Sequence, residues 1–356
     1  MKICFFAASN STHSHQWINF FSNLGHKIIW ISLVPATIKV SDNIEYYEFT
    51  SGIFSSIFKV RKLIAKLNPD IVHIHYLGYY GLLGLFSGSN KIISTPWGSD
   101  VIEGKKSFLK KQILYRILRK SKLIICDAYH MRDELKKLNV PSTKINIINF
   151  GVDTKTFVKK ERNLKVLDKF NISNELTIIS LRNFEAVYDI KTLILAAKII
   201  LKQIPDVHFL LVGRGTLEKE LKELVHSLGI NNSIHFTGFI DKQLLPSLLS
   251  SSDIYVSTSL SDAGLSSSTA EAMSCETPVV ISDSAENDQW INNMVNGFLF
   301  STKSFEQLAE ILIKLIKDKP LRLKVGKEGR NIIVKKNDYE NEMKKVNNLY
   351  LKILKT

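Results

Sequence analysis

The sequence predicts an α/β protein with two parallel-sheet domains. Short apolar runs typical of buried strands alternate with helical patterns in both halves of the chain, and this alternation is the pattern of βαβ units. A chain of 356 residues, 45% of them hydrophobic, is long enough to bury two separate cores. We therefore expect ligands to bind beyond the carboxyl ends of the strands in each sheet.

The first half carries six strand-like runs and two clear helical patterns. A helix that ends at Gly25 follows the first run, as a crossover between parallel strands requires. Strands are expected at 3–8, 27–34, 70–76, 91–95, 122–127 and 145–149, and helices at 16–24 and 54–67.

The second half repeats this organisation, and its last residues form a charged amphipathic pattern. Strands are expected at 176–181, 207–212, 233–237, 253–256 and 279–282, and helices at 190–201, 217–228 and 337–356. The predicted division is a first domain at 1–157, a charged linker at 158–171, a second domain at 172–335 and a terminal helix at 336–356 that returns to the first domain.

The net charge of +14 is the compositional outlier. A strongly basic surface indicates a polyanionic partner, such as nucleic acid, an anionic membrane or a phosphorylated substrate. Lysine-rich usage without any such partner is the other explanation, and charge alone does not separate the two. The three cysteines have no metal-ligand or disulfide spacing, which favours a reducing cytosol.

Two apolar stretches bear on membrane insertion. The run after Met1-Lys2 is too short for a signal-peptide core. The longest apolar stretch, at 77–86, is about half of the ~20 residues that a membrane span needs. We expect a cytoplasmic protein that does not cross a bilayer.

A run of hydroxyl side chains, at 266–269, lies between a predicted strand and a predicted helix. Serines at this place cap the helix, whose first N–H groups and dipole favour a phosphate. Glu271, near the helix start, can accept hydrogen bonds from a ribose or sugar diol. A nucleotide sugar fits this pattern, and an ordinary serine cap at a strand-to-helix junction is the alternative.

This stretch resembles the donor-site signature of the retaining glycosyltransferases of family four, which have the GT-B fold of two Rossmann-like domains facing across a cleft. Glu271-Ala272-Met273 and Thr277-Pro278-Val279-Val280 match it, and Gly264 stands in a comparable loop. Asp262 lies nine residues before Glu271 rather than eight, and Ala263 occupies the eighth place, so the loop is expected to be one residue longer. The resemblance implies a donor site formed in part by Asp262, Gly264, Leu265, Ser266, Ser267, Ser268 and Glu271.

Further residues match the family at other strand ends. Arg182 stands where relatives hold the donor diphosphate, whereas Tyr188 replaces a lysine. Leaving-group stabilisation would therefore rest on Arg182, because a guanidinium neutralises a diphosphate and a tyrosine only forms hydrogen bonds. The resemblance implies that the donor also contacts Asn183, Tyr188, Gly213, Phe239 and Ile240, and that Arg182, Glu271 and Asp262 are the catalytic residues.

The acceptor side is expected at strand ends of the first domain. Pro96 to Asp100 resembles a family motif in which Trp97 here replaces a histidine that contacts the sugar. His75 and His15 are candidates to supply that contact, although a lone histidine at a strand end is more often structural. The predicted acceptor-side residues are Ser9, His15, His75, Trp97, Gly98 and Asp100.

The segment 104–122 contains eight basic residues among leucines and aromatic residues. Such a helix can lie on an anionic lipid surface. The alternative is a packed helix with lysines extending over its edges. The resemblance favours membrane contact, because it implies a lipid-linked acceptor, and hence a peripheral location at the inner face of the membrane.

The expected activity is transfer of a sugar from a nucleoside diphosphate sugar, such as a UDP-sugar, to a hydroxyl of a glycan or lipid-linked acceptor. The resemblance implies retention at the anomeric carbon, a role in polysaccharide or lipopolysaccharide synthesis, no metal or other cofactor, and no nucleic-acid partner. Two alternatives stay open. One is a nucleotide-sugar epimerase of the same fold, and the other is a non-catalytic partner subunit.

Overall fold

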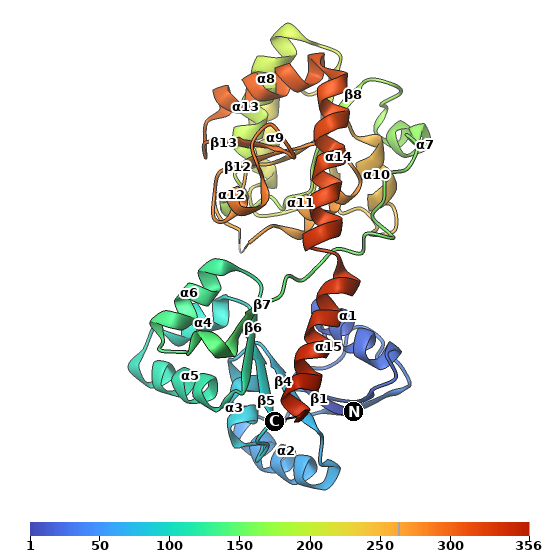
Figure 1. Cartoon of the computed structure of the whole chain (residues 1–356). Coiled ribbons are helices and arrows are strands. Elements are labelled where there is room, and N and C mark those ends of the chain that lie inside the picture. Colours follow the sequence, from blue (N-terminus) through green and yellow to red (C-terminus); the bar gives the residue numbers. More distant parts are fainter. Residues whose placement is uncertain (263, 356) are drawn as a thin grey trace. The chain divides into compact units, whose positions relative to one another are not determined.

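A computed structural model describes residues 1–262 and 264–355 of the chain, without the side chain of Glu103. The chain forms two compact units (Figure 1). The first unit comprises Met1–Asn149 and Asn341–Thr356, and the second unit comprises Phe150–Glu340. Each unit has its own hydrophobic core around a parallel sheet, which confirms the predicted fold class.

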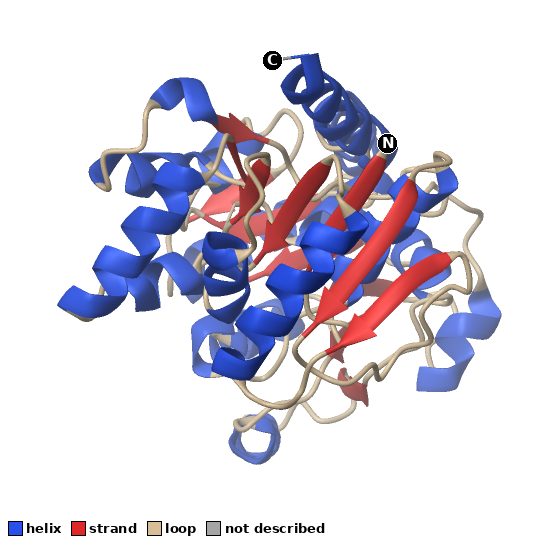
Figure 2. Ribbon diagram, turned by 90° about the horizontal axis from the view of Figure 1, so that it is seen from below, coloured by secondary structure: helices blue, strands red, loops and turns tan. Residues whose placement is uncertain are grey.

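The first unit is built on a seven-stranded parallel sheet in the order β3-β2-β1-β4-β5-β6-β7. Helices flank the sheet (Figure 2). The strand order reverses between β1 and β4, and such a switch point leaves a ligand crevice at the carboxyl ends of the strands. The strands are β1 (Lys2–Phe6), β2 (Lys27–Ser32), β3 (Ile44–Glu48), β4 (Ile71–His75), β5 (Ile92–Thr95), β6 (Leu123–Cys126) and β7 (Ile145–Ile147).

Six helices connect these strands. Helices α2, α3 and α5 lie side by side, and α4 packs on α5. The helices are α1 (Thr12–Asn23), α2 (Ile53–Leu67), α3 (Tyr79–Phe86), α4 (Ser99–Gly104), α5 (Phe108–Lys120) and α6 (Tyr129–Lys137).

The second unit is built on a six-stranded parallel sheet in the order β10-β9-β8-β11-β12-β13. Its switch point lies between β8 and β11. The strands are β8 (Leu176–Ser180), β9 (Val207–Val212), β10 (Ile234–Gly238), β11 (Ile254–Ser257), β12 (Val279–Ser282) and β13 (Phe298–Phe300). The helices are α7 (Leu164–Leu167), α8 (Ile190–Gln203), α9 (Glu218–Ser227), α10 (Leu245–Ser251), α11 (Ser267–Ser274), α12 (Asn287–Trp290), α13 (Phe305–Lys317) and α14 (Lys319–Lys336).

The terminal helix α15 (Tyr339–Lys355) packs in the first unit from Asn341 onward. Tyr350 is fully buried, its hydroxyl is hydrogen-bonded to Nδ1 of His73, and its ring lies 4.9 Å from that of Phe21. The tail returns to the first unit because the apolar side chains of α15, Met343, Val346 and Tyr350, are buried there.

The predicted linker is part of the second unit. The boundary lies between Asn149 and Phe150, not at 157. The N–H of Lys160 donates to Oγ of Ser250 at 3.1 Å, and Leu167, in α7, is fully buried. Residues 158–171 are charged yet still ordered, because α7 packs on α10.

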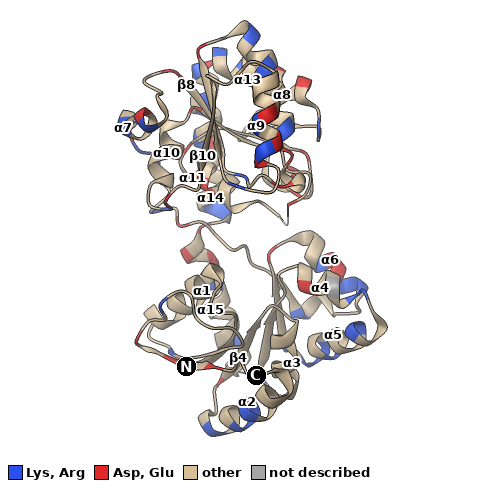
Figure 3. Cartoon of the chain, turned by 180° about the vertical axis from the view of Figure 1, so that it is seen from behind, with Lys and Arg blue, Asp and Glu red and all other residues tan. Residues whose placement is uncertain are grey.

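The two units differ in charge. The first unit contains 24 Lys and Arg against 10 Asp and Glu, whereas the second contains 24 of each. The first unit therefore carries the whole net charge of +14 (Figure 3). Cys4, Cys126 and Cys275 are buried and free. Within the described part of the chain, no helix is both long enough and apolar enough to cross a membrane.

Candidate functional site

A pocket of about 400 Å³ opens at the carboxyl edge of the sheet in the second unit. The residues that follow β8, β9 and β10 meet the first turn of α11 there. Nine of the predicted donor-site residues line the pocket: Arg182, Asn183, Tyr188, Gly213, Phe239, Ile240, Ser267, Ser268 and Glu271. The structure thus brings together residues that are as far as 89 positions apart in the sequence.

The first turn of α11 lines the pocket, and its amide groups lie at the start of a helix. Ser266 is the N-cap, and its Oγ accepts a hydrogen bond from the N–H of Thr269 at 3.3 Å. The N–H groups of Ser267 and Ser268 have no acceptor within the helix, as in any first turn. These two donors and the helix dipole favour an anion at this end of the pocket.

Arg182 is the cation of the site and already has a carboxylate partner. Its Nη2 donates to Oδ1 of Asp262, and only 9% and 11% of the two side chains are exposed. Nη1 lies 3.4 Å from Oγ of Ser268, while Nε is buried and has no hydrogen-bond partner among the described residues. Burial raises the pKa of the Asp262 carboxyl, and the nearby guanidinium acts in the opposite direction.

Tyr188 supports the guanidinium of Arg182 from one face. The Cζ atom of Arg182 lies 4.3 Å from the centre of the Tyr188 ring, which is a cation–π geometry. The carbonyl of Tyr188 accepts a hydrogen bond from Oγ1 of Thr258 at 2.8 Å, and the N–H of Leu260 donates to the carbonyl of Val187 at 2.8 Å. The turn that carries the ring is therefore tied to the loop that carries Asp262.

Glu271 lies one turn into α11, on the pocket wall. Burial disfavours its charged form and raises the pKa to about 7, while Lys242 acts in the opposite direction. A carboxyl with this pKa changes charge near neutral pH and can either accept or donate a hydrogen bond.

The remaining walls combine close backbone contacts with apolar side chains. A Cβ atom on Gly213 would lie 2.7 Å from the carbonyl oxygen of Arg182, so the approach of these two strand ends requires glycine. Phe239 is 71% exposed and extends from the end of β10. Three lining residues were not predicted, namely Leu181, Val212 and Leu245.

Four predicted donor-site residues do not line the pocket. Asp262 forms its ion pair with Arg182 without lining the pocket. Ser266 caps α11, and Leu265 packs against the core. Gly264 has a φ of +75°, in the left-handed region that favours glycine. Ala263, where the extra loop residue was predicted, lies outside the described residues.

The predicted acceptor-side residues form two groups in the first unit. In one group, Nε2 of His15 is 2.8 Å from the carbonyl oxygen of Ser9, whose hydroxyl donates to the carbonyl of Val34 at 2.9 Å. The His15 ring packs edge-on against Trp30, with the ring centres 4.7 Å apart. Both residues are buried, so these contacts give them a structural role in the loop after β1.

The second group surrounds the ends of β4 and β5. His75 is buried, its ring centre lies 5.9 Å from that of Trp97, and neither of its ring nitrogens has a hydrogen-bond partner among the described residues. Burial lowers its pKa to about 3, with a smaller contribution from His13, so the imidazole is neutral.

Asp100 and Gly98 shape the loop beside this histidine. Oδ2 of Asp100 accepts from the N–H of Leu77 at 2.6 Å, and Oδ1 accepts from those of Trp97 and Val101 at 3.0 Å. Burial raises the pKa of Asp100, and the backbone donors oppose this effect. Gly98 has a φ of +98°. Asp100 therefore fixes the two loops and has little capacity left for a substrate.

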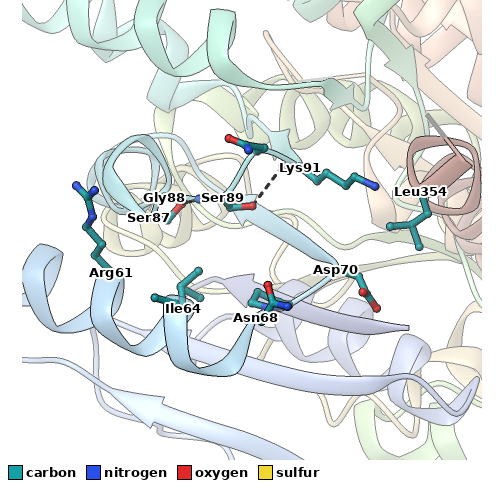
Figure 4. Close-up of a pocket in the computed structure, with 12 residues that line it drawn as sticks. Arg61, Ile64, Asn68, Asp70, Ser87, Gly88, Ser89, Lys91 and Leu354 are labelled. Atoms are coloured by element: carbon teal, nitrogen blue, oxygen red, sulfur yellow. Dashed lines mark hydrogen bonds between the residues drawn. The ribbon is translucent and has the colours of Figure 1, made fainter.

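Another pocket, of about 520 Å³, lies at the opposite edge of the sheet in the first unit (Figure 4). Residues that precede β4 and β5, such as Asp70 and Lys91, line it together with Arg61 and Leu354. None of the predicted residues is there. Ligands of parallel sheets bind at the carboxyl edge, so the pocket at α11 is the better candidate site.

The pocket at α11 therefore combines two free amide groups, a buried guanidinium and a carboxyl group with apolar walls. The amides and the guanidinium suit a diphosphate, and the carboxyl suits a diol. The apolar walls and Phe239 provide surfaces on which a planar base can stack.

Two family models match the chain. The model described as glycosyl transferases group 1 matches residues 164–332, and the model described as glycosyl transferase 4-like matches residues 2–128. The first match contains every pocket residue, and the second contains every predicted acceptor-side residue.

Curated relatives and solved structures agree with these models. The amylovoran biosynthesis glycosyltransferase AmsK of Erwinia amylovora is 25% identical over 69% of this chain and 61% of its own length. An alpha-monoglucosyldiacylglycerol synthase of Streptococcus pneumoniae is 26% identical over 68% of this chain and 57% of its own length. The chain thus matches less than two thirds of the length of these relatives. The crystal structure of Anabaena HepE in complex with UDP has the same fold, with a TM-score of 0.84, 17% identity, and coverage of 98% of this chain and 99% of that one.

Proposed function

The chain belongs to the glycosyltransferases with the GT-B fold, and from this premise we propose that it transfers a sugar from a nucleoside diphosphate sugar to an acceptor hydroxyl with retention at the anomeric carbon. The observation that carries the proposal is the position of Arg182, Glu271 and the first turn of α11 around one pocket. A UDP-sugar is the proposed donor, in keeping with the UDP bound by HepE.

The buried guanidinium supports the diphosphate part of this proposal. Nε of Arg182 has no protein partner among the described residues, and a buried donor without a partner is costly unless a ligand satisfies it. In our proposal the diphosphate accepts from Arg182 and from the N–H groups of Ser267 and Ser268. Glu271 accepts from a diol of the ribose or of the sugar.

The transfer step needs charge stabilisation at the leaving group. The bond between the anomeric carbon and the β-phosphate oxygen breaks, and the acceptor oxygen bonds to the same face of that carbon. The acceptor proton passes to the departing diphosphate, whose charge is held by Arg182 and α11. Donors that are already in place lower the barrier, because no reorganisation is needed as the charge develops. No metal or other cofactor is part of this proposal.

The proposed acceptor is a glycan or a lipid-linked hydroxyl in cell-surface polysaccharide or lipopolysaccharide synthesis. AmsK is described as acting in amylovoran biosynthesis, and the streptococcal relative is described as a glucosyldiacylglycerol synthase. We also propose peripheral contact with the inner, anionic face of the membrane and no nucleic-acid partner. The confinement of the net charge of +14 to the first unit supports this contact, because a general lysine bias would affect both units.

A transfer assay tests the proposal. The protein is incubated with a panel of UDP-sugars and with membrane extract as the acceptor source, and sugar incorporation is compared for the wild type, Glu271→Gln and Asp241→Asn. Asp241 is an exposed carboxylate of the same unit that does not line the pocket. We expect incorporation by the wild type and Asp241→Asn but not by Glu271→Gln; equal incorporation by all three would refute the site.

An acceptor-free arm separates transfer from epimerisation. Both matching family models describe transferases, which favours transfer over the epimerase alternative. A new nucleotide sugar formed without an acceptor would reverse that conclusion. Nucleotide binding without incorporation from any donor would favour the non-catalytic alternative.

A further inference from the structure

The first unit contains an apolar pocket that the donor site does not use. It has a volume of about 330 Å³ and lies between α3 and α5. Leu82 lines it from α3, Ile113 and Ile117 line it from α5, and Tyr76 and Leu77 form the end nearest β4. The helices approach closely here, since a Cβ atom on Gly81 would lie 2.7 Å from Cδ1 of Ile117.

Among the residues whose side chains the structure describes, Asp100 and Lys110 are the charged ones that line this pocket. They differ in how free they are to bind a ligand. Both oxygens of Asp100 accept hydrogen bonds from backbone N–H groups, so this carboxylate is already satisfied. Lys110 is exposed and brings a cation to the pocket edge. Apolar walls with one accessible cation suit a ligand that has a hydrocarbon chain and an anionic group.

The surface around the pocket has the same character. Tyr79, Phe108 and Leu109 are 67%, 79% and 71% exposed, on the helices that form the pocket. Tyr79 also lines a neighbouring pocket of about 290 Å³, together with Leu33, Phe49 and Ile53. This surface therefore combines exposed apolar side chains with two apolar pockets, in a unit of net charge +14. Such a surface is unsuited to a small polar sugar acceptor.

The pocket adjoins the predicted acceptor side. Tyr76 and Leu77 directly follow His75, the last residue of β4, and Asp100 links Leu77 to the loop of Trp97. An occupant of this pocket therefore has its other end at the carboxyl edge of the sheet, where acceptors are expected.

We propose that the pocket between α3 and α5 binds the hydrocarbon chain of an amphiphilic acceptor, whose anionic group pairs with Lys110. This inference rests on the proposed function, and it narrows the acceptor to a lipid that carries a phosphate or similar group near the reacting hydroxyl. The polar part of the lipid extends toward His75 and Trp97.

Three soluble probes test the site on the full chain. Decyl phosphate, decyl maltoside and inorganic phosphate are titrated by calorimetry below the micellar concentrations of the two amphiphiles, with saturating UDP present so that the proposed anion site at α11 is occupied. We expect decyl phosphate to bind at one site, decyl maltoside to bind more weakly, and inorganic phosphate not to bind. Equal binding of decyl phosphate and inorganic phosphate would overturn the proposal, because the chain would then contribute nothing.

Variants locate the binding. Leu82→Asp should weaken decyl phosphate binding by at least about tenfold, because a carboxylate would then lie against the chain. Leu82→Trp, which fills the pocket without adding charge, should weaken it similarly and covers the case in which Leu82→Asp does not fold. Unchanged affinity in the folded variants would overturn the proposal.

Two adjacent lysines provide a matched pair. Lys110 lines the pocket and Lys111 does not, although both are exposed on α5. Lys110→Glu should weaken decyl phosphate binding by about fivefold, the size of an exposed ion pair, and Lys111→Glu should change it little. Equal losses in both would indicate binding to a general basic surface and would overturn the pocket assignment.

Binding of UDP separates this inference from the proposed function. All the variants above lie in the first unit and should bind UDP as the wild type does. A protein that binds UDP but not decyl phosphate disproves only the acceptor pocket. A protein that does not bind UDP disproves the proposed function.

Discussion

The two units share one architecture but have different surfaces. Each has a parallel sheet whose strand order reverses once, and in each the candidate site lies at the carboxyl edge. The second unit has no net charge, and the cation of its pocket, Arg182, lies in a buried ion pair. The first unit has a net charge of +14 and exposes large apolar side chains such as Phe54 and Phe108. The same fold thus supports a pocket around a buried cation in one unit and a basic, apolar surface in the other.

Removing Arg182, the cation of the pocket at α11, should have the largest effect on activity. Arg182→Ala should lower kcat/KM by at least about a hundredfold, the usual loss for a preorganised transition-state donor. It also leaves the buried Asp262 without its ion-pair partner, which should cost about 3–5 kcal/mol of stability. Steady-state kinetics and chemical denaturation measure the two effects.

The double variant Arg182→Ala/Asp262→Asn separates these losses. Removing the buried charge should restore much of the stability, while kcat/KM should stay low. If activity recovered with stability, Arg182 would be structural and would not bind the leaving group.

Membrane binding tests the charge of the first unit. Lys110→Glu/Lys111→Glu should weaken binding to anionic vesicles by at least about tenfold at low salt, because each cation near such a surface contributes about 1 kcal/mol. The difference should decrease at high salt, where the interaction is screened. Vesicle sedimentation measures both.

The matched control reverses two exposed lysines of α14 in the second unit, Lys324→Glu/Lys327→Glu. The net charge of the chain changes by the same amount, and vesicle binding should not change. Equal losses from both pairs would mean that total charge matters and that the first unit is not a specific surface.

Replacing the aromatic ring of Tyr188, which lies against the guanidinium of Arg182, should weaken UDP binding moderately. Tyr188→Leu removes a cation–π contact of about 0.5–2 kcal/mol, so the Kd for UDP should rise by about two- to thirtyfold. Tyr188→Phe keeps the ring and should bind UDP almost as the wild type does. If the Phe variant lost as much affinity as the Leu variant, the phenolic oxygen and not the ring would matter.

The pH dependence of UDP binding should reveal a smaller effect from Glu271. Its pKa of about 7 means that the carboxylate becomes available for the diol as pH rises through 7, so UDP affinity should increase over that range. Glu271→Gln should remove this dependence. A profile unaffected by the substitution would exclude Glu271 as the titrating group.

The free energy of unfolding should change in the opposite direction to UDP affinity as pH rises toward 7. The pKa of Glu271 in the folded protein lies above the ordinary value of 4.5, so the folded state binds more protons than the unfolded state between pH 4.5 and about 7. The contribution of this group to stability therefore falls as pH rises through that window. Denaturation of the wild type and Glu271→Gln at several pH values measures the difference.

Metal removal should have no effect. The proposed stabilisation of the leaving group comes from Arg182 and α11, so dialysis against EDTA should leave kcat/KM unchanged. A loss of activity that Mg²⁺ or Mn²⁺ restores would show that a metal shares this role.

The sequence predicted much of the second unit because the relevant signals are local. Strand-end positions and the serine run placed Arg182, Gly213 and Ser267 where the structure has them, since parallel strands align their carboxyl ends. Ser266 was also expected as a cap residue. Leu181 and Val212 end apolar strand runs, so the same rule could have found them. Leu245 lies at the start of α10, a helix that was not predicted.

Other features depend on tertiary packing and could not be predicted. The pairing of Arg182 with Asp262 joins residues 80 positions apart, and no local pattern indicates it. Strand β3 was missed because its sequence, IEYYE, places polar side chains on an edge strand. Helix α13 was missed although its amphipathic repeat was readable. The hydrogen bonds of His15 and Asp100, which give them structural roles, depend on how the loops pack.

Binding of UDP to a proline variant at the start of α11 would show whether the diphosphate lies against this helix. Ser267 is the first residue of the helix, where proline is tolerated and removes the N–H group together with the hydroxyl. We predict that Ser267→Pro raises the Kd for UDP by about tenfold or more, the value of one hydrogen bond to a charged group, while Ser267→Ala, which keeps the N–H, changes it little. A folded Ser267→Pro variant that binds UDP as tightly as the wild type would contradict the account, because the phosphate would then not bind at this helix.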